Sequence, residues 1–270
     1  MKIKVMEYNI FNGFFDRDKN NELKPNKERE QAAKKIVNQE KPDILILTEA
    51  DHTKNKNFKQ NYKEIFNYPH GVFASKPLAH RDFGIGILSK YPIVKHKTFL
   101  FPKSRWIKTS IKIKKKIIHL DAIHPNPHNT QKEKENLFKK LVNKKENPYI
   151  VGGDFNAISP YDKYDKKSLL NNFTKKLNNL EKANKIVKEI IKTNIIRFLI
   201  KKGLKDTYKE KNKKQDYSYH TQLSGNNYMR IDYILCSKDF KIISSGIIKN
   251  ELAEKASDHY PIYAVLELND

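Results

Sequence analysis

The segment Gly152-Gly153-Asp154-Phe155-Asn156 places a carboxylate and a carboxamide two residues apart at the end of an apolar run. The preceding Tyr149-Ile150-Val151 is typical of a buried strand, which the two glycines are expected to end. Side chains two residues apart on an extended chain point the same way, so Asp154 and Asn156 could present an acid and an amide to one pocket. The alternative is a turn that either side chain closes by bonding its own backbone.

Polar residues recur in the same way at the ends of, or inside, other apolar runs. The set comprises Asn9, Glu49, His124, Asp154, Asn156, Asp232, Asp258 and His259. An ionisable residue in such a position costs free energy unless it is paired or bound to a metal. One of them could be a satisfied hydrogen bond in the core, but several on separate strands indicate a shared polar site.

The residue types in this set select a chemistry. Oxygen donors from Glu, Asp and Asn, without a cluster of Cys or His, suit hard ions such as Mg2+ or Mn2+. Two histidines far apart in sequence can serve as an acid/base group and as a stabiliser of phosphate. The sequence has neither the glycine-rich loop of P-loop NTPases nor the G-x-S-x-G turn of many serine hydrolases.

Short motifs occur in a fixed order along nearly the whole chain. They are Tyr8-Asn9-Ile10, Thr48-Glu49, Gly84-Ile85-Gly86-Ile87-Leu88-Ser89, His124-Pro125, Gly153-Asp154-Phe155-Asn156, Arg230-Ile231-Asp232-Tyr233 and Ser257-Asp258-His259-Tyr260-Pro261. This order resembles the endonuclease/exonuclease/phosphatase superfamily, which includes exonuclease III and deoxyribonuclease I. The resemblance implies a four-layer α/β/β/α sandwich with the site at one edge of two packed sheets.

The resemblance also implies roles for the polar residues. Glu49 would be the main metal-binding carboxylate, with Asn9 beside it and Asp258 as a further contact. His259 would lie at the scissile phosphate, polarised by Asp232. The rest of the catalytic set acts on water and phosphate: Asp154 would orient or deprotonate the attacking water, and Asn156 and His124 would donate hydrogen bonds to phosphoryl oxygens.

Substrate contacts are implied for the segment around Arg230. Tyr219 or His220 could stack on a base or sugar, although a tyrosine in the core is an equal alternative for Tyr219. Two departures from exonuclease III-like repair enzymes concern specificity. Phe11 stands where they usually carry an acidic or amide residue, and Tyr228-Met229 stands where they often carry Trp. The resemblance therefore implies hydrolysis but not a preference for abasic sites.

The elements that must position these residues are short strands and a few helices. Strands are predicted at 2–10, 43–49, 71–75, 83–89, 92–99, 107–113, 116–123, 148–153, 230–236, 241–248 and 260–268, and helices at about 27–40, 131–145 and 167–202. The short connections Lys90-Tyr91-Pro92 and Lys114-Lys115 predict antiparallel pairs. Two mainly antiparallel sheets packed face to face with helices outside, an α+β sandwich, are the expected fold.

The chain is expected to form a single domain over residues 1–270, since no repeat and no linker rich in Pro, Gly or Ser interrupts it. Residues 161–216 are rich in Lys and Asn with apolar residues at helical spacing, which predicts a helical insert. The favoured interpretation of its basic face is simple solvation. The alternative is a basic arm that follows a phosphate backbone.

The composition narrows the class of protein. With 270 residues, of which 38% are hydrophobic, the chain can bury a sizeable core. Its formal net charge of +23 indicates an anionic partner, and nucleic acid is the first candidate. DNA is the expected polymer, and RNA stays an alternative. Only six of the 54 basic residues are arginine, so a lysine-rich compositional bias is the alternative explanation of the charge.

The sequence also bears on location. A single cysteine, Cys236, excludes an internal disulfide framework and fits a reducing compartment. The first residues lack the apolar core of a signal peptide, and no run approaches the roughly 18 apolar residues of a membrane span. We expect a cytoplasmic protein without membrane contact, and no obligate protein partner is inferred.

Three functions are compatible with these features. The first is a Mg2+-dependent nuclease, an endonuclease or exonuclease, that hydrolyses DNA phosphodiester bonds by in-line attack of water. The second is a phosphatase or phosphodiesterase acting on a small-molecule or lipid phosphate. The third is a nucleic-acid-binding protein without turnover, although such a protein has no physical need for this complete set of acids and histidines.

Overall fold

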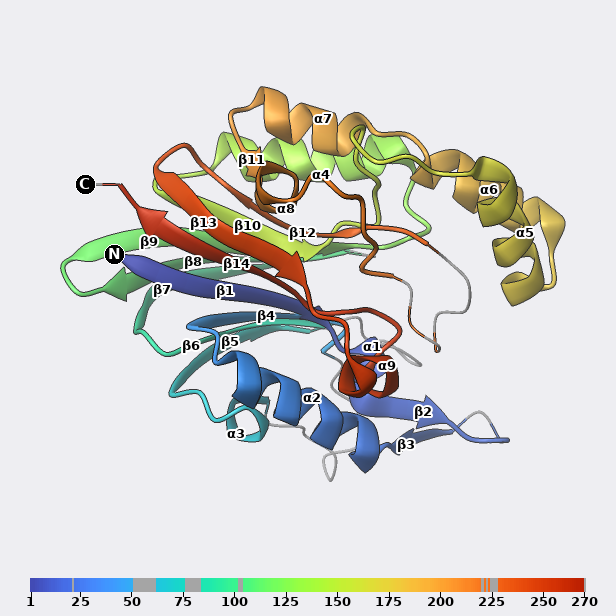
Figure 1. Cartoon of the computed structure of the whole chain (residues 1–270), viewed down its shortest axis with the longest axis horizontal. Coiled ribbons are helices and arrows are strands. Elements are labelled where there is room, and N and C mark those ends of the chain that lie inside the picture. Colours follow the sequence, from blue (N-terminus) through green and yellow to red (C-terminus); the bar gives the residue numbers. More distant parts are fainter. Residues whose placement is uncertain are drawn as a thin grey trace.

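Two six-stranded sheets are packed face to face between helices in the computed structural model, which describes residues 1–20, 22–50, 62–75, 84–101, 104–219, 221, 223 and 228–269 (Figure 1). The first sheet has the order β13 (Phe240–Ile247), β14 (Ile262–Leu268), β1 (Lys2–Asn9), β4 (Ile44–Thr48), β6 (Ile85–Ser89) and β5 (His70–Ala74). The second has the order β11 (Lys205–Asp206), β12 (Asp232–Cys236), β10 (Tyr149–Asp154), β9 (Lys116–Pro125), β8 (Ser104–Ile113) and β7 (Ile93–Phe101).

Alternate residues of each central strand build two different apolar layers. On β1, Ile3 and Val5 pack between the sheets, whereas Met6 and Tyr8 pack toward the helices outside the first sheet. Because successive side chains of a strand point to opposite faces, a strand buried on both sides reads as a continuous apolar run. That double burial explains why the central strands were recognisable from the sequence.

Helices cover the outer face of both sheets (Figure 1). Those on the first sheet are α2 (Lys27–Glu40), α3 (Tyr62–Ile65) and α9 (Glu251–Ala256). Those on the second sheet are α4 (Gln131–Asn143) and α7 (Asn194–Lys201), which share one apolar cluster with it. α4 begins at a capping box, in which Thr130 and Glu133 satisfy each other's backbone N–H groups. The predicted α/β/β/α sandwich is confirmed.

The predicted helical region 167–202 is three helices rather than one. α5 (Lys166–Leu177) ends at Asn178, which has a left-handed backbone with φ 47°, and Asn179 caps the start of α6 (Leu180–Ile190). α5 and α6 bury a small apolar cluster of their own, and they lie at the end of the sandwich away from the termini (Figure 1). α7 instead packs on the second sheet, and α8 (Thr207–Lys211) packs against β13 of the first sheet and β12 of the second, so the stretch 161–216 contributes to the sandwich itself.

One predicted strand pair is wrong. The link Lys114-Lys115 does join antiparallel neighbours, with Ile113 opposite Lys116. The link Lys90-Tyr91-Pro92 instead carries the chain from β6 in the first sheet to β7 in the second. Here Ser89 Oγ accepts the N–H of Tyr91 and the Pro92 carbonyl accepts a hydrogen bond from β8, so the link crosses between layers instead of forming a hairpin.

The two glycines before Asp154 do not end their strand, because β10 continues through both of them to Asp154. Gly153 has φ 146°, and a Cβ there would lie 2.0 Å from the carbonyl oxygen of Ile123 on the neighbouring strand. Glycine is required at this position because the two backbones approach so closely. The glycine pair is thus a packing device within the strand that carries Asp154.

Three small elements that follow β1 along the chain escaped sequence prediction: α1 (Phe11–Phe14), β2 (Phe15–Arg17) and β3 (Leu23–Pro25). α1 is a short turn whose residues have positive φ, 43° at Phe11, 54° at Asn12, 63° at Gly13 and 67° at Phe14. Left-handed backbone at non-glycine residues costs about 1–3 kcal/mol each and concentrates at functional sites.

In the described part of the chain, no helix is both long and apolar enough to cross a bilayer.

Candidate active site

Each sheet contains one parallel strand pair, and both pairs end at the same edge of the sandwich. In the first sheet β1 and β4 run parallel, with Asn9 opposite Thr48, the residue before Glu49. In the second sheet β9 and β10 run parallel, which brings His124 and Asp154 to that edge. Parallel strands present their carboxyl ends on one side, so the topology itself gathers these polar residues.

A histidine–aspartate pair lies at the centre of this edge. Asp232 begins β12 directly opposite Asp154, and its Oδ2 lies 2.8 Å from Nδ1 of His259. His259 is only 3% exposed. Burial alone would lower the pKa of His259, but the Asp232 carboxylate outweighs it, and the pKa stays well above the ordinary value. The carboxylate fixes the proton on Nδ1, which leaves Nε2 facing the site.

Two serine hydroxyls hold this pair in place. Ser218 Oγ accepts the backbone N–H groups of Ile231 and Asp232, each at 3.2 Å. Ser257 Oγ accepts the N–H of His259 and donates to the carbonyl of Asn9 at 2.6 Å. The histidine loop is therefore tied directly to the end of β1. The sequence assigned neither serine a role, although Ser257 begins the motif that contains Asp258 and His259.

Asn9 lies between the groups of the two sheets. Its Nδ2 is 3.2 Å from Asp154 Oδ2, 3.5 Å from Glu49 Oε1 and 3.5 Å from His259 Nε2. Its Oδ1 already accepts the N–H of Phe11 at 3.0 Å. The amide presents its nitrogen to the two carboxylates, and the role of Asn9 as a metal ligand stays a prediction. In this geometry the Asn9 amide nitrogen orients the carboxylates.

Asp154 and Asn156 combine the two interpretations of the GGDFN segment. Asp154 Oδ1 accepts the N–H of Asn156 at 2.8 Å and closes a turn, with Asn156 left-handed at φ 46°. Asp154 Oδ2 faces Asn9 and the histidines. Burial, followed by the charge of Asp232, raises the pKa of Asp154 to about 8. The Asn156 amide donates to the Pro125 carbonyl, so its side chain stabilises the turn.

His124 is a buried neutral histidine. Its Nε2 lies 3.7 Å from Asp154 Oδ2, which places it beside the central pair. Burial and the nearby His259 charge lower the pKa of His124 to about 3. A neutral imidazole can donate one hydrogen bond without adding charge. The predicted role of His124 as a donor to a phosphoryl oxygen therefore remains a prediction that this geometry permits.

The acids and the histidine form a group that could hold a metal ion. Three potential ligand atoms lie within 4.8 Å of one another, one each from Asp154, Asp232 and His259. Glu49 borders this group and is half-buried, and its Oε2 accepts the N–H of Asn12 at 2.9 Å. Asp258 Oδ1 is buried without a hydrogen-bond partner among the described residues and lies 3.9 Å from His259 Nε2. Buried carboxylate oxygens in this number fit a hard divalent cation.

Arg29 is a structural residue of the site that sequence reasoning missed. It projects from α2, is 4% exposed, and packs over the ring of Phe11. Its guanidinium donates to four backbone carbonyls and one carboxylate, those of Ile10, Phe11, Phe15, Ala256 and Asp16. These bonds join the left-handed turn that supports Glu49 to the loop that carries Asp258 and His259. Arginine is rare in this lysine-rich chain, and that rarity is the one sequence signal that could have found it.

Two further buried ionisable side chains lie next to the site. Glu7 faces the same side of β1 as Asn9 and accepts a hydrogen bond from Thr48 at 3.0 Å, and burial followed by the Asp232 charge raises its pKa. Lys134 of α4 is 1% exposed and donates to the Asn156 carbonyl at 2.9 Å. Burial lowers the pKa of Lys134 to about 8. The two-residue period of the first strand could have indicated Glu7, but nothing local marks Lys134.

The predicted substrate residues have different placements. Arg230 is 1% exposed, and its guanidinium is fully engaged by the carboxylates of Asp162 and Asp206, so it offers no group to a ligand here. The Tyr219 ring lies 4.7 Å from the His259 ring, and its hydroxyl accepts from Lys176 of α5 at 2.5 Å. Tyr219 thus borders the site. His220 lies outside the described residues.

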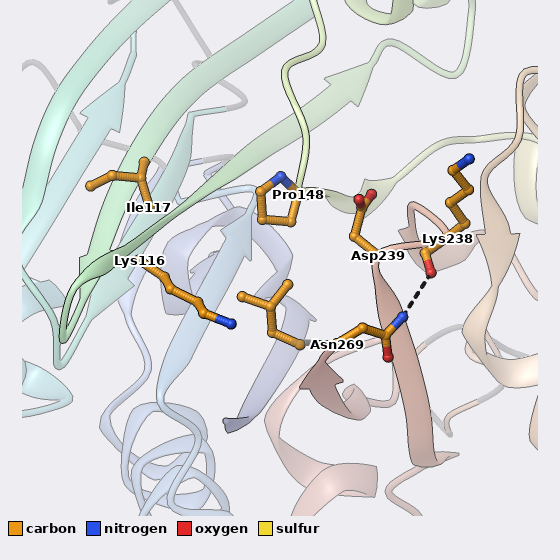
Figure 2. A pocket seen from close by; sticks show the side chains of 7 residues that line it. Lys116, Ile117, Pro148, Lys238, Asp239 and Asn269 are labelled. Atoms are coloured by element: carbon orange, nitrogen blue, oxygen red, sulfur yellow. Dashed lines mark hydrogen bonds between the residues drawn. The ribbon is translucent and has the colours of Figure 1, made fainter.

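The cavity shown in Figure 2 lies at the other end of the sandwich. It has a volume of about 560 Å3 and is lined by Lys116, Pro148, Lys238, Asp239 and Asn269 among others. Lys116 begins the strand whose far end carries His124. The Asn269 amide donates to the Lys238 carbonyl across this cavity at 3.2 Å (Figure 2). Since none of the predicted site residues lines it, it is separate from the chemistry described above.

Comparisons with known proteins agree with this architecture. Residues 6–259 match the model of the Endonuclease/Exonuclease/phosphatase family. No curated protein matched the sequence.

Solved structures share the fold at low identity. The 3' phosphatase NExo from Neisseria, bound to product DNA hairpin, has a TM-score of 0.70 and 18% identity, covering 99% of either chain. An AP endonuclease from Archaeoglobus fulgidus has a TM-score of 0.66 and 20% identity, covering 98% of this chain and 100% of its own. An endonuclease/exonuclease/phosphatase from Beutenbergia cavernae has a TM-score of 0.70 and 15% identity over 99% of this chain and 72% of its own.

Proposed function

Because the chain belongs to the Endonuclease/Exonuclease/phosphatase family, whose members hydrolyse phosphate esters, we propose that it is a Mg2+- or Mn2+-dependent DNA nuclease. The observation that carries this proposal is the convergence of both sheets on one buried group, the Asp232–His259 pair with Asp154 and Glu49 beside it. The proposed reaction is in-line attack of water on a phosphodiester.

The histidine pair supplies a fixed positive donor. Asp232 holds Nδ1 of His259 and raises the pKa of the ring above its ordinary value, which favours the protonated ring with Nε2–H directed toward the centre of the site. A phosphoryl oxygen placed there would receive a charge-assisted hydrogen bond as negative charge builds on it. The neutral His124 ring, on the other side of Asp154, would add a second donor.

Asp154 is the residue we propose to orient or deprotonate the attacking water. Its Oδ1 is held by the N–H of Asn156, and Asn9 holds its Oδ2 toward the two histidines. A pKa near 8 makes this carboxylate a stronger base than an exposed aspartate. Removing either support would leave the carboxylate free to rotate away from the water.

Glu49 and Asp258 are the proposed holders of the divalent ion. Glu49 is half-buried and oriented by the Asn12 N–H, and Asp258 contributes a buried oxygen without a hydrogen-bond partner among the described residues. When bound, Mg2+ or Mn2+ would neutralise charge that develops on the phosphoryl and leaving-group oxygens. The raised pKa values of the buried acids Glu7 and Asp154 fit a site that gains stability when a cation binds.

Nucleic acid is supported as the substrate by charge and by analogy. The formal net charge of +23 favours a polyanion. Of the similar structures, one is a 3' phosphatase bound to product DNA and another is an AP endonuclease. The first of these also motivates a second candidate, a phosphatase that removes terminal phosphate groups from DNA.

The testing experiment measures Mg2+-dependent turnover of labelled DNA duplexes that are intact, abasic or 3'-phosphorylated, alongside bis-p-nitrophenyl phosphate. We expect cutting of DNA that falls at least ~10²-fold in Glu49→Ala and in His259→Ala, since each removes charge stabilisation or acid/base catalysis. Release of terminal phosphate alone would select the phosphatase. Full activity in either variant would contradict the assignment, and turnover restricted to the small ester would exclude DNA as substrate.

A further inference from the structure

A second cavity lies beside the candidate active site, between α6, the end of α5 and the segment that joins β9 to α4. Its volume is about 390 Å3. Pro127, Leu177 and Ile186 supply its apolar wall, and Lys182 and Lys185 supply its charge. Ligand pockets in proteins commonly have volumes of about 300–1,000 Å3 with few polar groups, which is enough for one nucleotide.

A buried lysine links the wall of this cavity to the catalytic edge. Lys134 Nζ donates to the Asn156 carbonyl at 2.9 Å and lies 3.5 Å from the Pro127 carbonyl. One ammonium group therefore joins the turn of Asp154 to the wall of the cavity. Pro127 also follows His124 by three residues, so at most about 11 Å of chain separates them.

The cavity is basic. Lys182 and Lys185 are exposed, and in the described part of the chain no carboxylate lies within ion-pair distance of either ammonium group. The one acid of the lining, Glu189, is paired with Lys192 at 2.5 Å and accepts the N–H of Gln131. Lys182, Lys185 and Glu189 recur at helical spacing, so a single face of α6 lines the cavity.

We propose that this cavity binds one nucleotide of the strand whose scissile phosphate lies at His259. The phosphate would lie on Lys182 and Lys185, and the sugar and base would contact Pro127, Leu177 and Ile186. Successive phosphates of one strand advance by about 3.4 Å along a duplex axis, so the cavity lies within a few nucleotides of the reaction. This assignment rests on the proposed nuclease function and gives the basic face of α6 a specific ligand.

The test measures binding of a labelled single-stranded DNA oligonucleotide to the Glu49→Ala protein at several salt concentrations. Adding Lys182→Gln and Lys185→Gln should weaken binding roughly tenfold and reduce the slope of log K against log salt by about 0.7 for each phosphate that is no longer neutralised. The matched control carries Lys175→Gln and Lys188→Gln, which remove the same charge from exposed positions of α5 and α6 outside the cavity. We expect the control to bind within about twofold of its parent.

A second variant, Ile186→Trp, fills the cavity without changing charge and should weaken binding as well. Equal affinities for the cavity variants and the control would overturn the proposal, as would no binding of the oligonucleotide by the Glu49→Ala parent. The two proposals fail separately. A protein that binds DNA through the cavity but cuts no DNA would contradict only the nuclease function. A protein that cuts DNA yet binds it equally after the cavity changes would contradict only this subsite.

Discussion

Two buried arginines support the two halves of the site, and they do so with opposite kinds of partner. Arg29 supports the half built on the first sheet, where four of its five acceptors are neutral backbone carbonyls. Arg230 precedes Asp232 in the second sheet, and its partners are the buried carboxylates of Asp162 and Asp206. Arg29 therefore fixes the course of loops, whereas Arg230 neutralises charge.

Because of this difference, the two arginines should affect different properties: Arg29 the geometry of the proposed metal site, and Arg230 the stability of the fold. The carbonyls that Arg29 holds belong to the turn under Glu49 and to the residue before Ser257, so Arg29 sets the spacing between the two proposed metal ligands. The ion pairs of Arg230 lock α8 and the loop of Asp162 onto β12, away from the reacting groups. We expect removal of Arg230 to affect mainly folding, and removal of Arg29 to affect mainly metal binding.

The largest expected effect is on stability. Arg230→Met leaves the buried carboxylate of Asp206 without its ion-pair partner and leaves Asp162 with Lys209 alone, and loss of a buried ion-pair partner typically costs about 3–5 kcal/mol. Arg29→Met leaves mainly carbonyl groups unsatisfied, with an expected cost of about 1–3 kcal/mol. Urea unfolding of both variants measures the two free energies.

Adding Asp162→Asn and Asp206→Asn to Arg230→Met tests the cause of that destabilisation. Restored stability would identify uncompensated charge as the reason. An equal cost for Arg29→Met and Arg230→Met would remove the distinction between the two halves.

The next effect is on metal binding. Arg29→Lys keeps the charge but cannot reproduce the planar fork that reaches five acceptors. We expect the Mg2+ concentration for half-maximal activity to rise about tenfold, corresponding to a change of ~1.4 kcal/mol. The increase in melting temperature on adding Mn2+ should shrink in parallel, and this readout does not depend on turnover.

Arg197→Lys is the matched control for this prediction, because Arg197 lies exposed on α7. Its metal response should equal that of the parent protein. An unchanged Mn2+ response in Arg29→Lys would show that the loops keep their spacing without the guanidinium.

The smallest expected effect is on the pH dependence of stability, and it concerns Lys134 in the second half of the site. Lys134, like Arg29, is a buried cation on a backbone carbonyl, but its pKa of about 8 lies below the usual lysine value of about 10.4. Between these values the unfolded chain binds more protons than the folded one, so stability rises with pH. From about pH 7 to about pH 9, the protein should gain about 1 kcal/mol relative to Lys134→Met.

Unfolding at both pH values measures this gain, and all other titrating groups cancel between the two proteins. A constant difference across the range would mean that Lys134 titrates normally despite its burial.

The sequence predicted the strands and the polar residues at their ends because both depend on local pattern. Tyr149-Ile150-Val151 is apolar on both faces, and Asp154 follows it, so the strand and its acid are visible together. The crossing at Lys90-Tyr91-Pro92 was not predictable in this way, because the length and composition of a short link fit both a hairpin and a passage to the other sheet.

The contacts that set the site geometry were hidden for a related reason. The amide orientation of Asn9 depends on the N–H of Phe11, which in turn depends on a left-handed turn held by Arg29. The acceptors of Arg29 are carbonyls, which every residue carries, so no residue type marks them. Lys134 likewise bonds a carbonyl and looks in the sequence like any other lysine of an amphipathic helix.

The central claim is that the two halves form one catalytic unit, and a double-mutant cycle tests it most directly. DNA cleavage is measured for Glu49→Ala from the first half, Asp232→Ala from the second, and the combined variant, with folding checked by melting temperature. When two residues act as a unit, the losses of activity caused by their single substitutions do not multiply. The double variant should therefore cleave DNA about as slowly as the less active of the two single variants. Losses that multiply, or a single variant that keeps full activity, would contradict the account.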